Sequence, residues 1–160
     1  MDRLIELLKT NGRASAEDLA KALSRSPQEV EQQIEALEAE GTLLGFQAIF
    51  DSEKINDNGT VEAVIEVRIT PERDGGFDRL ASRIARFAEV QSCYLMSGGY
   101  DLMVLVQGPT LQSVARFISE RLSTIPGIVS TATHFRLKAY KEKGLLIERE
   151  PQSQRLPVTP

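Results

Sequence analysis

Residues 90–106, VQSCYLMSGGYDLMVLV, contain two apolar runs on either side of two consecutive glycines, Gly98 and Gly99. The runs are rich in β-branched and aromatic residues, which favour strands. Paired glycines supply the positive φ angles of a tight reversal between strands. We therefore predict a β-hairpin whose turn is Ser97–Tyr100.

The predicted hairpin is apolar on both faces. Residues at every second position of a strand share a face. One face would carry Cys93, Leu95, Leu102, Val104 and Val106, and the other Tyr94, Met96, Asp101 and Met103. In a small domain with helices on one side of the sheet, the second apolar face stays open to solvent. We expect another subunit to cover that face.

Composition places the chain among globular proteins. Its 160 residues, of which 41% are hydrophobic, are enough for one or two small domains with a real core. No apolar run approaches the roughly 18 residues that a membrane span needs. The first residues, MDRLIELLKT, mix acids and bases and differ from a secretory signal. We expect a cytoplasmic protein without a membrane partner.

Catalytic and metal chemistry find little support in the sequence. One cysteine, Cys93, and one histidine, His134, form neither an internal disulfide nor a zinc site, and we expect both to be structural. We find no nucleophile with a neighbouring base and no phosphate-binding loop. The sequence predicts no catalytic residue, no metal and no cofactor, and therefore no enzyme.

The first 41 residues predict three short helices. Apolar residues at helical spacing and two capping motifs place the helix starts near Leu4, at Ser15 and at Ser26, and the last helix ends at Gly41. Only a tight turn separates Leu23 from Ser26, so the second and third helices must cross at a large angle. This arrangement is a helix-turn-helix.

Three further segments complete the expected domain organisation. Residues 42–50, TLLGFQAIF, look strand-like and would form the wing of a DNA-binding domain that spans residues 1–50. Residues 51–60, DSEKINDNGT, are polar and contain Asn-Gly, so we interpret them as a linker. Residues 148–160 form a polar, proline-containing tail that we expect to be disordered.

Residues 61–147 alternate between strand and helix patterns. We predict strands at 61–70, in the hairpin 90–106 and at 128–138, and helices at 77–88 and 110–125. The order is β-α-β-β-α-β. With right-handed crossovers this order gives an antiparallel sheet with both helices on one face, an α+β fold.

Four fragments resemble a known family when taken in order and spacing. They are LEAEGTLLGF at 37–46, GGYDL at 98–102, PGI at 126–128 and TAT at 131–133. Together they resemble the Lrp/AsnC, or feast/famine, transcriptional regulators of bacteria and archaea. The similarity runs from Leu4 to Leu146.

The resemblance implies an N-terminal winged helix-turn-helix that binds double-stranded DNA and a C-terminal ferredoxin-like domain that senses ligands. In this family the sheets pack face to face as dimers, and dimers often assemble further, up to octameric rings. Amino acids or other small molecules bind between dimers near the hairpin turn. The resemblance thus predicts a homo-oligomeric transcriptional regulator with a small-molecule effector, most simply an amino acid.

The expected recognition helix is acidic. Residues 1–50 hold five Lys and Arg against nine Asp and Glu, and no cation occurs between Arg25 and Lys54. Cations supply most non-specific DNA affinity, whereas glutamine side chains read adenine edges. The expected DNA-binding residues are Arg13, Lys21, Arg25, Ser26, Gln28, Gln32 and Gln33. The alternative is a sensor or assembly partner that has lost its basic helix and binds no DNA.

The expected effector site lies at the hairpin turn and the last strand, which can be neighbours in a ferredoxin-like sheet. Its residues are Met96, Ser97, Gly98, Gly99, Tyr100, Asp101, Thr131 and Thr133. Asp101 either accepts hydrogen bonds from backbone N–H groups of the turn or meets the ammonium of a ligand. Thr131 and Thr133 either bind a ligand carboxylate or serve only the strand. The alternative for Gly98 and Gly99 is that they serve only the geometry of the turn.

Overall fold

The computed structural model describes residues 2–55, 59–71 and 76–147. The chain divides into two compact units, Met1–Ile49 and Phe50–Pro160, here called the N-terminal and C-terminal units. The expected tail, 148–160, lies outside the described residues. Within the described ranges no helix is long and apolar enough to cross a membrane.

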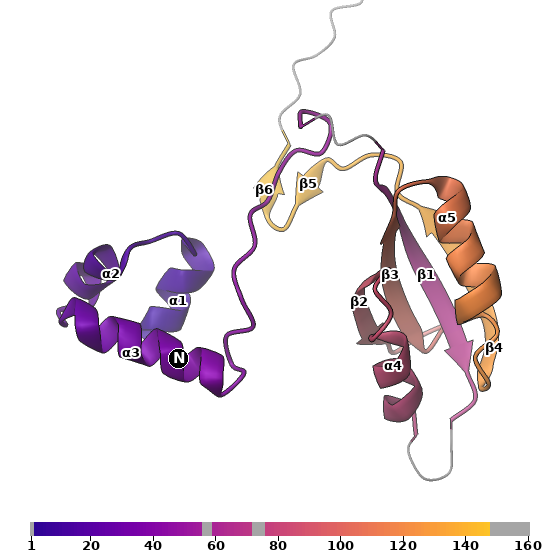
Figure 1. Ribbon diagram of the computed structural model, residues 1–160, viewed down its shortest axis with the longest axis horizontal. Coiled ribbons are helices and arrows are strands. Elements are labelled where there is room, and N and C mark those ends of the chain that lie inside the picture. The colour runs from indigo at the N-terminus through magenta and orange to yellow at the C-terminus, as the bar shows by residue number, and fades with distance from the viewer. Residues whose placement is uncertain (1, 56–58, 72–75, 148–160) are drawn as a thin grey trace, which may run out of the picture. The chain divides into compact units, whose positions relative to one another are not determined.

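The N-terminal unit contains the three expected helices, α1 (Arg3–Thr10), α2 (Ala16–Leu23) and α3 (Pro27–Ala39) (Figure 1). Each begins at a side-chain cap, which satisfies backbone N–H groups that the first turn leaves free. The caps are Asp2, Ser15 and Ser26. Leu4, Leu19, Ala20 and Val30 form the fully buried centre of the unit. The helix-turn-helix is confirmed.

The turn between α2 and α3 is tight because a left-handed residue is followed at once by a capping box. Ser24 has φ 55° and ψ 46°, which reverses the chain after α2. The Ser26 N–H then donates to Glu29 Oε2 at 2.8 Å, and the Glu29 N–H donates to Ser26 Oγ at 3.2 Å. This reciprocal cap starts α3 without an intervening loop.

The strand expected at residues 42–50 is not formed within one chain. The N–H groups of Thr42 and Leu43 donate to Leu37 O, each at 2.9 Å, and residues 43–50 belong to no strand. Leu44 is 94% exposed. A strand needs a second strand for its backbone hydrogen bonds. The apolar pattern of this segment therefore predicted a strand that is not formed within one chain.

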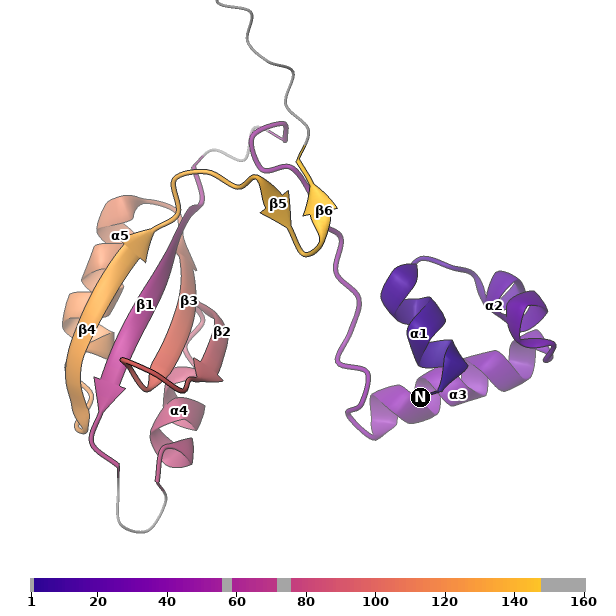
Figure 2. The ribbon, with the colours of Figure 1, turned by 180° about the vertical axis from the view of Figure 1, so that it is seen from behind.

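The C-terminal unit is built on a four-stranded antiparallel sheet with the order β2-β3-β1-β4. Its strands are β1 (Val61–Ile69), β2 (Val90–Leu95), β3 (Leu102–Gly108) and β4 (Ile128–Phe135). Helices α4 (Asp78–Ile84) and α5 (Leu111–Arg116) cover one face of the sheet (Figures 1 and 2). The predicted α+β fold is confirmed, with a shorter first helix and a shorter last strand than expected.

A π-helical segment, η1 (Phe117–Leu122), continues α5. The Ser123 N–H donates to Ile118 O, five residues earlier, at 2.8 Å. The wider turn of a π-helix changes which side chains share a face. Here Phe117, Ile118 and Leu122 are all buried against the sheet.

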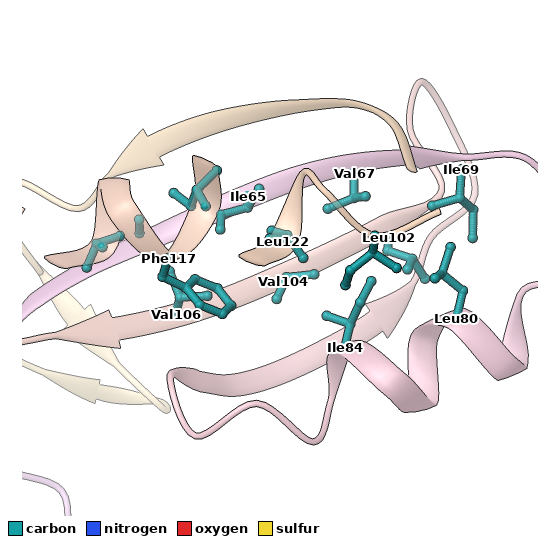
Figure 3. Close-up of a cluster of buried hydrophobic side chains, with 14 residues drawn as sticks. Ile65, Val67, Ile69, Leu80, Ile84, Leu102, Val104, Val106, Phe117 and Leu122 are labelled. Carbon is teal, nitrogen blue, oxygen red and sulfur yellow. The ribbon is translucent and has the colours of Figure 1, made fainter. Parts of the chain in front are cut away.

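Alternate residues of the two central strands form the core (Figure 3). Ala63, Ile65 and Val67 of β1 lie opposite Val106, Val104 and Leu102 of β3, and all six are buried. The predicted alternation of β3 is therefore confirmed. Leu95 also lies on the expected face, since it pairs with Leu102, but it is 59% exposed at the end of the edge strand β2.

The predicted hairpin between β2 and β3 is confirmed, but its loop is wider than a tight turn. Residues 96–101 separate the strands, and the Met96 N–H donates to Asp101 O at 2.8 Å to close the loop. Gly98 has φ 142°, whereas Gly99 does not adopt a positive φ. The expectation that both glycines need this freedom is therefore wrong.

A second, small hairpin follows β4 and was not predicted. It consists of β5 (Lys141–Glu142) and β6 (Leu145–Leu146). Lys143 and Gly144 have φ 42° and 91°, as both central residues of a two-residue I′ turn require. Arg136 joins this hairpin to the sheet, since its guanidinium contacts Glu142 at 2.9 Å and Glu62 at 2.8 Å.

The close approach of β3 to α5 predicts a strong effect at Gly108. A methyl group there would lie 2.8 Å from Ser113 Oγ and 2.9 Å from Val114 Cγ2. We expect Gly108→Ala to lower the free energy of unfolding by about 1–3 kcal/mol through overpacking. Gly99→Ala is the control, because nothing lies within 4 Å of that position.

All three tyrosines lie in the C-terminal unit. Urea titration followed by tyrosine fluorescence, at one protein concentration, therefore reports on that unit. Equal stability of the two variants would contradict the packing described at Gly108.

Candidate DNA-binding surface and effector site

Two glutamines face outward on α3. A rotation of about 100° per residue places Gln28 and Gln32 on the side opposite the buried Val30. Both glutamines are exposed. Their amides are thus free to meet the edges of bases, as expected from the sequence.

Gln33 lies elsewhere. It is half-buried at the side of α3, and Arg25 Nη1 donates to its Oε1 at 2.5 Å. Its Nε2 donates in turn to Asp2 Oδ2. The amide of Gln33 is therefore bonded within the unit on both sides, which the sequence did not reveal because Asp2 and Gln33 are far apart along the chain.

The expected phosphate contacts are spread over the first two helices and the turn. Arg13 lies between α1 and α2, where its N–H donates to Asn11 Oδ1 at 3.1 Å. Lys21 is in the last turn of α2, and Arg25 precedes the cap of α3. All three cations are exposed.

Acidic side chains set the electrostatics of α3. Glu31, Glu35 and Glu38 are exposed. The pKa of Glu29 is lowered, first by the hydrogen bond from the Ser26 backbone and then by that from its hydroxyl. The Glu29 carboxylate thus stays charged at the positive end of the helix dipole, where a negative charge is favourable.

The hairpin loop of the C-terminal unit meets the end of β1. The Asp101 N–H donates to Val67 O at 3.0 Å, and Asp101 Oδ2 accepts the Ile69 N–H at 2.8 Å. The sheet register shifts between Arg68 and Ile69, so this carboxylate satisfies a backbone donor at an irregular point. Of the two roles expected for Asp101, the structure shows the backbone contact, although to β1 instead of the turn.

The expected effector residues form two separate groups. Met96–Asp101 form one loop, in which Ser97, Gly98 and Gly99 are exposed. Thr131 and Thr133 lie on β4, opposite Val67 and Ile65 of β1, on the face that the helices cover. Thr131 Oγ1 is 3.3 Å from Ser123 Oγ.

Strand β1 separates these two groups, because the sheet order places it between β3 and β4. Two strand spacings amount to about 10 Å. Within one chain, the hairpin tip and the last strand are therefore not neighbours in the sheet, contrary to the expectation.

The described residues of the C-terminal unit leave the sheet face opposite the helices open. Its large apolar residues include Val64, Tyr94, Met103 and Leu105, and Tyr94 is 50% exposed. Beside them His134 Nε2 lies 3.3 Å from Glu66 Oε1. The hairpin pattern had indicated this face, whereas the contributions of Val64, Leu105 and the Glu66–His134 pair had been missed.

Cys93 and the acidic side chains do not suggest further chemistry. Burial raises the pKa of the Cys93 thiol, which suits a structural residue packed against Ala81. Among the described residues no group of three or more His, Cys, Asp or Glu side chains is placed to hold a metal ion.

Comparisons with known families decide the class of protein. The winged helix-turn-helix DNA-binding model matches residues 3–43, and the Lrp/AsnC ligand-binding domain model matches residues 62–146. The chain belongs to the Lrp/AsnC family. Each of these two matches falls within one structural unit.

Relatives of full length support this assignment. YugG of Bacillus subtilis, an uncharacterised HTH-type transcriptional regulator, is 43% identical over 157 residues, covering 98% of this chain and 95% of its own length. The leucine-responsive regulatory protein of Escherichia coli K12 is 22% identical over 144 residues, covering 90% and 87%. A Neisseria meningitidis transcriptional regulator, solved as a complex with L-Met, has the same fold, with a TM-score of 0.67 at 22% identity over 92% of this chain and 96% of its own.

This Lrp/AsnC protein is therefore a DNA-binding transcriptional regulator with a ligand-binding domain. The family binds DNA and small-molecule effectors. Its relatives are transcriptional regulators, and nothing among the described residues points to catalysis.

The contact between Asp101 and β1 predicts a stability effect that is independent of any ligand. We expect Asp101→Ala to lower the free energy of unfolding by about 1.5–3 kcal/mol, because it removes a hydrogen bond to a charged acceptor. Ser97→Ala, an exposed change in the same loop, should lie within about 0.5 kcal/mol of wild type. Urea titrations of the two variants provide the test, and a neutral Asp101→Ala would show that the Ile69 contact is not formed in solution.

Proposed function

We propose that this regulator binds operator DNA through α3 as a homodimer, and that an amino acid bound at the hairpin loop shifts its DNA affinity or its assembly. The proposal rests on two features that occur together in this chain. One is a helix-turn-helix with outward-facing Gln28 and Gln32, and the other is a ligand-binding unit with an uncovered apolar sheet face.

The DNA contact would depend on glutamine more than on positive charge. Glutamine amides can form paired hydrogen bonds with adenine in the major groove. Arg13, Lys21 and Arg25 are the cations near the reading surface, so about three phosphates per subunit would be neutralised. A regulator must be in the same compartment as the DNA that it binds. The cytoplasmic location expected from the sequence is therefore part of this proposal.

The dimer would form through the sheet face that the helices leave open. Val64, Met103 and Leu105 are only half-buried in a single chain. Burying such a face against a second copy gains hydrophobic free energy, and a two-fold axis makes the same patch serve both partners. Higher assembly, up to the octamer implied by the resemblance, is part of the same proposal.

The effector proposal rests on the loop 96–101 and on the L-Met bound by the Neisseria meningitidis relative. Exposed backbone groups at Gly98 and Gly99 can meet a ligand carboxylate, and Asp101 can meet its ammonium. Since β1 separates this loop from Thr131 and Thr133, a pocket that uses both groups would have to combine two subunits. A ligand that binds one assembly or DNA-affinity state better than another shifts the population toward it.

One observation favours a second function. The exposed glutamates of α3, among them Glu31 and Glu35, would repel phosphate, so the chain could instead be a sensor or assembly partner without DNA affinity. DNA binding by the purified protein separates the two functions directly.

The scarcity of cations predicts a shallow salt dependence of DNA binding. For a dimer we expect the logarithm of the association constant to fall with the logarithm of salt with a slope of about −5. Fluorescence anisotropy with a random-sequence duplex at several salt concentrations measures this slope. A slope of about −10, as for a strongly basic repressor, would mean that the DNA surface lies elsewhere.

Gln32→Arg should raise affinity for the same random duplex several-fold at low salt, because it adds one phosphate contact per subunit. Gln112→Arg is the matched control, since it adds the same charge at an exposed position of α5. If the two variants bind the duplex equally, α3 does not face the DNA.

Calorimetry with individual amino acids tests the effector proposal. We expect at least one to bind the wild-type protein, and to bind Asp101→Ala at least tenfold more weakly. Asp78→Ala, which removes a carboxylate of α4 distant in sequence from the loop, should bind as the wild type does. Binding that is unchanged in Asp101→Ala would remove Asp101 from the site, and binding of no amino acid would favour a constitutive regulator.

A further inference from the structure

Arg25 is the cation closest to the start of the acidic recognition helix. It directly precedes Ser26, the N-cap of α3, and the chain has no further Lys or Arg before Lys54. In helix-turn-helix proteins the N-terminal residues of the recognition helix contact base edges. The orientation of this one guanidinium therefore matters more here than in a protein with a basic helix.

The backbone of Arg25 is held by the end of α2. Its N–H donates to Ala20 O at 3.0 Å, and the left-handed Ser24 directs the chain into that contact. This pattern closes a helix and fixes the following residue. The Cα of Arg25 is thus anchored to α2 before its side chain makes any contact.

The side chain of Arg25 is held by α3. Its Nη1 donates to Gln33 Oε1 at 2.5 Å, although Gln33 lies eight residues later, in the middle of the helix. A guanidinium has five N–H donors, of which Gln33 takes one. The others remain to meet a phosphate or the O6 and N7 atoms of guanine.

Asp2 determines which way the Gln33 amide points. A carboxylate only accepts hydrogen bonds, so Asp2 Oδ2 requires the NH2 group of Gln33 and leaves the amide oxygen facing Arg25. The other oxygen, Asp2 Oδ1, accepts the Leu4 N–H at 3.0 Å as the cap of α1. The series of contacts thus begins at the N-cap of α1.

We infer that Asp2 and Gln33 form a positioning chain that holds Arg25 in place at the DNA-reading end of α3. Gln33 then acts through Arg25 and does not read a base itself. Ordering a long arginine side chain before binding reduces the entropy that complex formation would otherwise cost. The inference rests on the proposed binding of DNA through α3.

The test uses a duplex that the wild-type protein selects from a random pool, together with a scrambled duplex of the same composition. We expect Gln33→Met to bind the selected duplex about tenfold more weakly, equivalent to about 1.4 kcal/mol. Binding to the scrambled duplex should change less than threefold, because the charge of Arg25 is kept. In an Arg25→Ala background, Gln33→Met should have no further effect on either duplex.

A charge-neutral exchange separates positioning from a structural role. Asp2→Asn keeps a good cap for α1 but lets the Gln33 amide turn round, so it should lose part of the preference for the selected duplex. Combining Asp2→Asn with Gln33→Glu restores the positioning chain with donor and acceptor exchanged between positions 2 and 33. The new amide at position 2 donates to the new carboxylate at position 33, and that carboxylate accepts from Arg25. We expect the double variant to recover most of the preference, at unchanged net charge.

Controls distinguish the possible outcomes. Gln112→Met on α5 should leave binding to both duplexes unchanged, and thermal unfolding of every variant reports on folding. Equal losses on both duplexes, no loss at all in Gln33→Met, or no recovery in the double variant would overturn the positioning role while leaving DNA binding intact. A wild-type protein that binds no duplex, even at low salt, would overturn the proposed function and this inference together.

Discussion

The alternation of side chains along β1 sets the roles of the two faces of the sheet. Ala63, Ile65 and Val67 face the helices and are buried, whereas Glu62, Val64 and Glu66 face the other way. Because β1 is hydrogen-bonded to both β3 and β4, its register fixes which residues of those strands join each face. The core, the position of the hairpin loop and the uncovered face all follow from this one strand.

Local patterns predicted most of the fold. The caps at Ser15 and Ser26 and the period-two runs around the hairpin each specify an element through neighbouring residues, and those elements are present. Residues 42–50 were not predictable in the same way, because they carry the pattern of a strand but belong to no strand within one chain. Leu95 has the right period, yet its exposure depends on where the covering helices end.

The candidate sites were predicted less completely, because they depend on contacts between distant residues. The hairpin pattern located the loop 96–101, but the contact of Asp101 with Ile69 spans 32 positions and has no local signature. The same holds for Gln33 and Asp2, which are 31 positions apart. Thr131 and Thr133 were placed on a strand correctly, while their face depends on pairing with β1.

The central claim is that a second copy of this chain covers the open sheet face, since both DNA reading by paired helices and an effector site shared by subunits depend on it. Sedimentation equilibrium of the wild-type protein at micromolar concentration tests it most directly. The account predicts a mass of at least twice 17.7 kDa, and a shift toward 17.7 kDa in Leu105→Glu, which places a charge on that face. A wild-type protein that sediments as a single species of 17.7 kDa would contradict it.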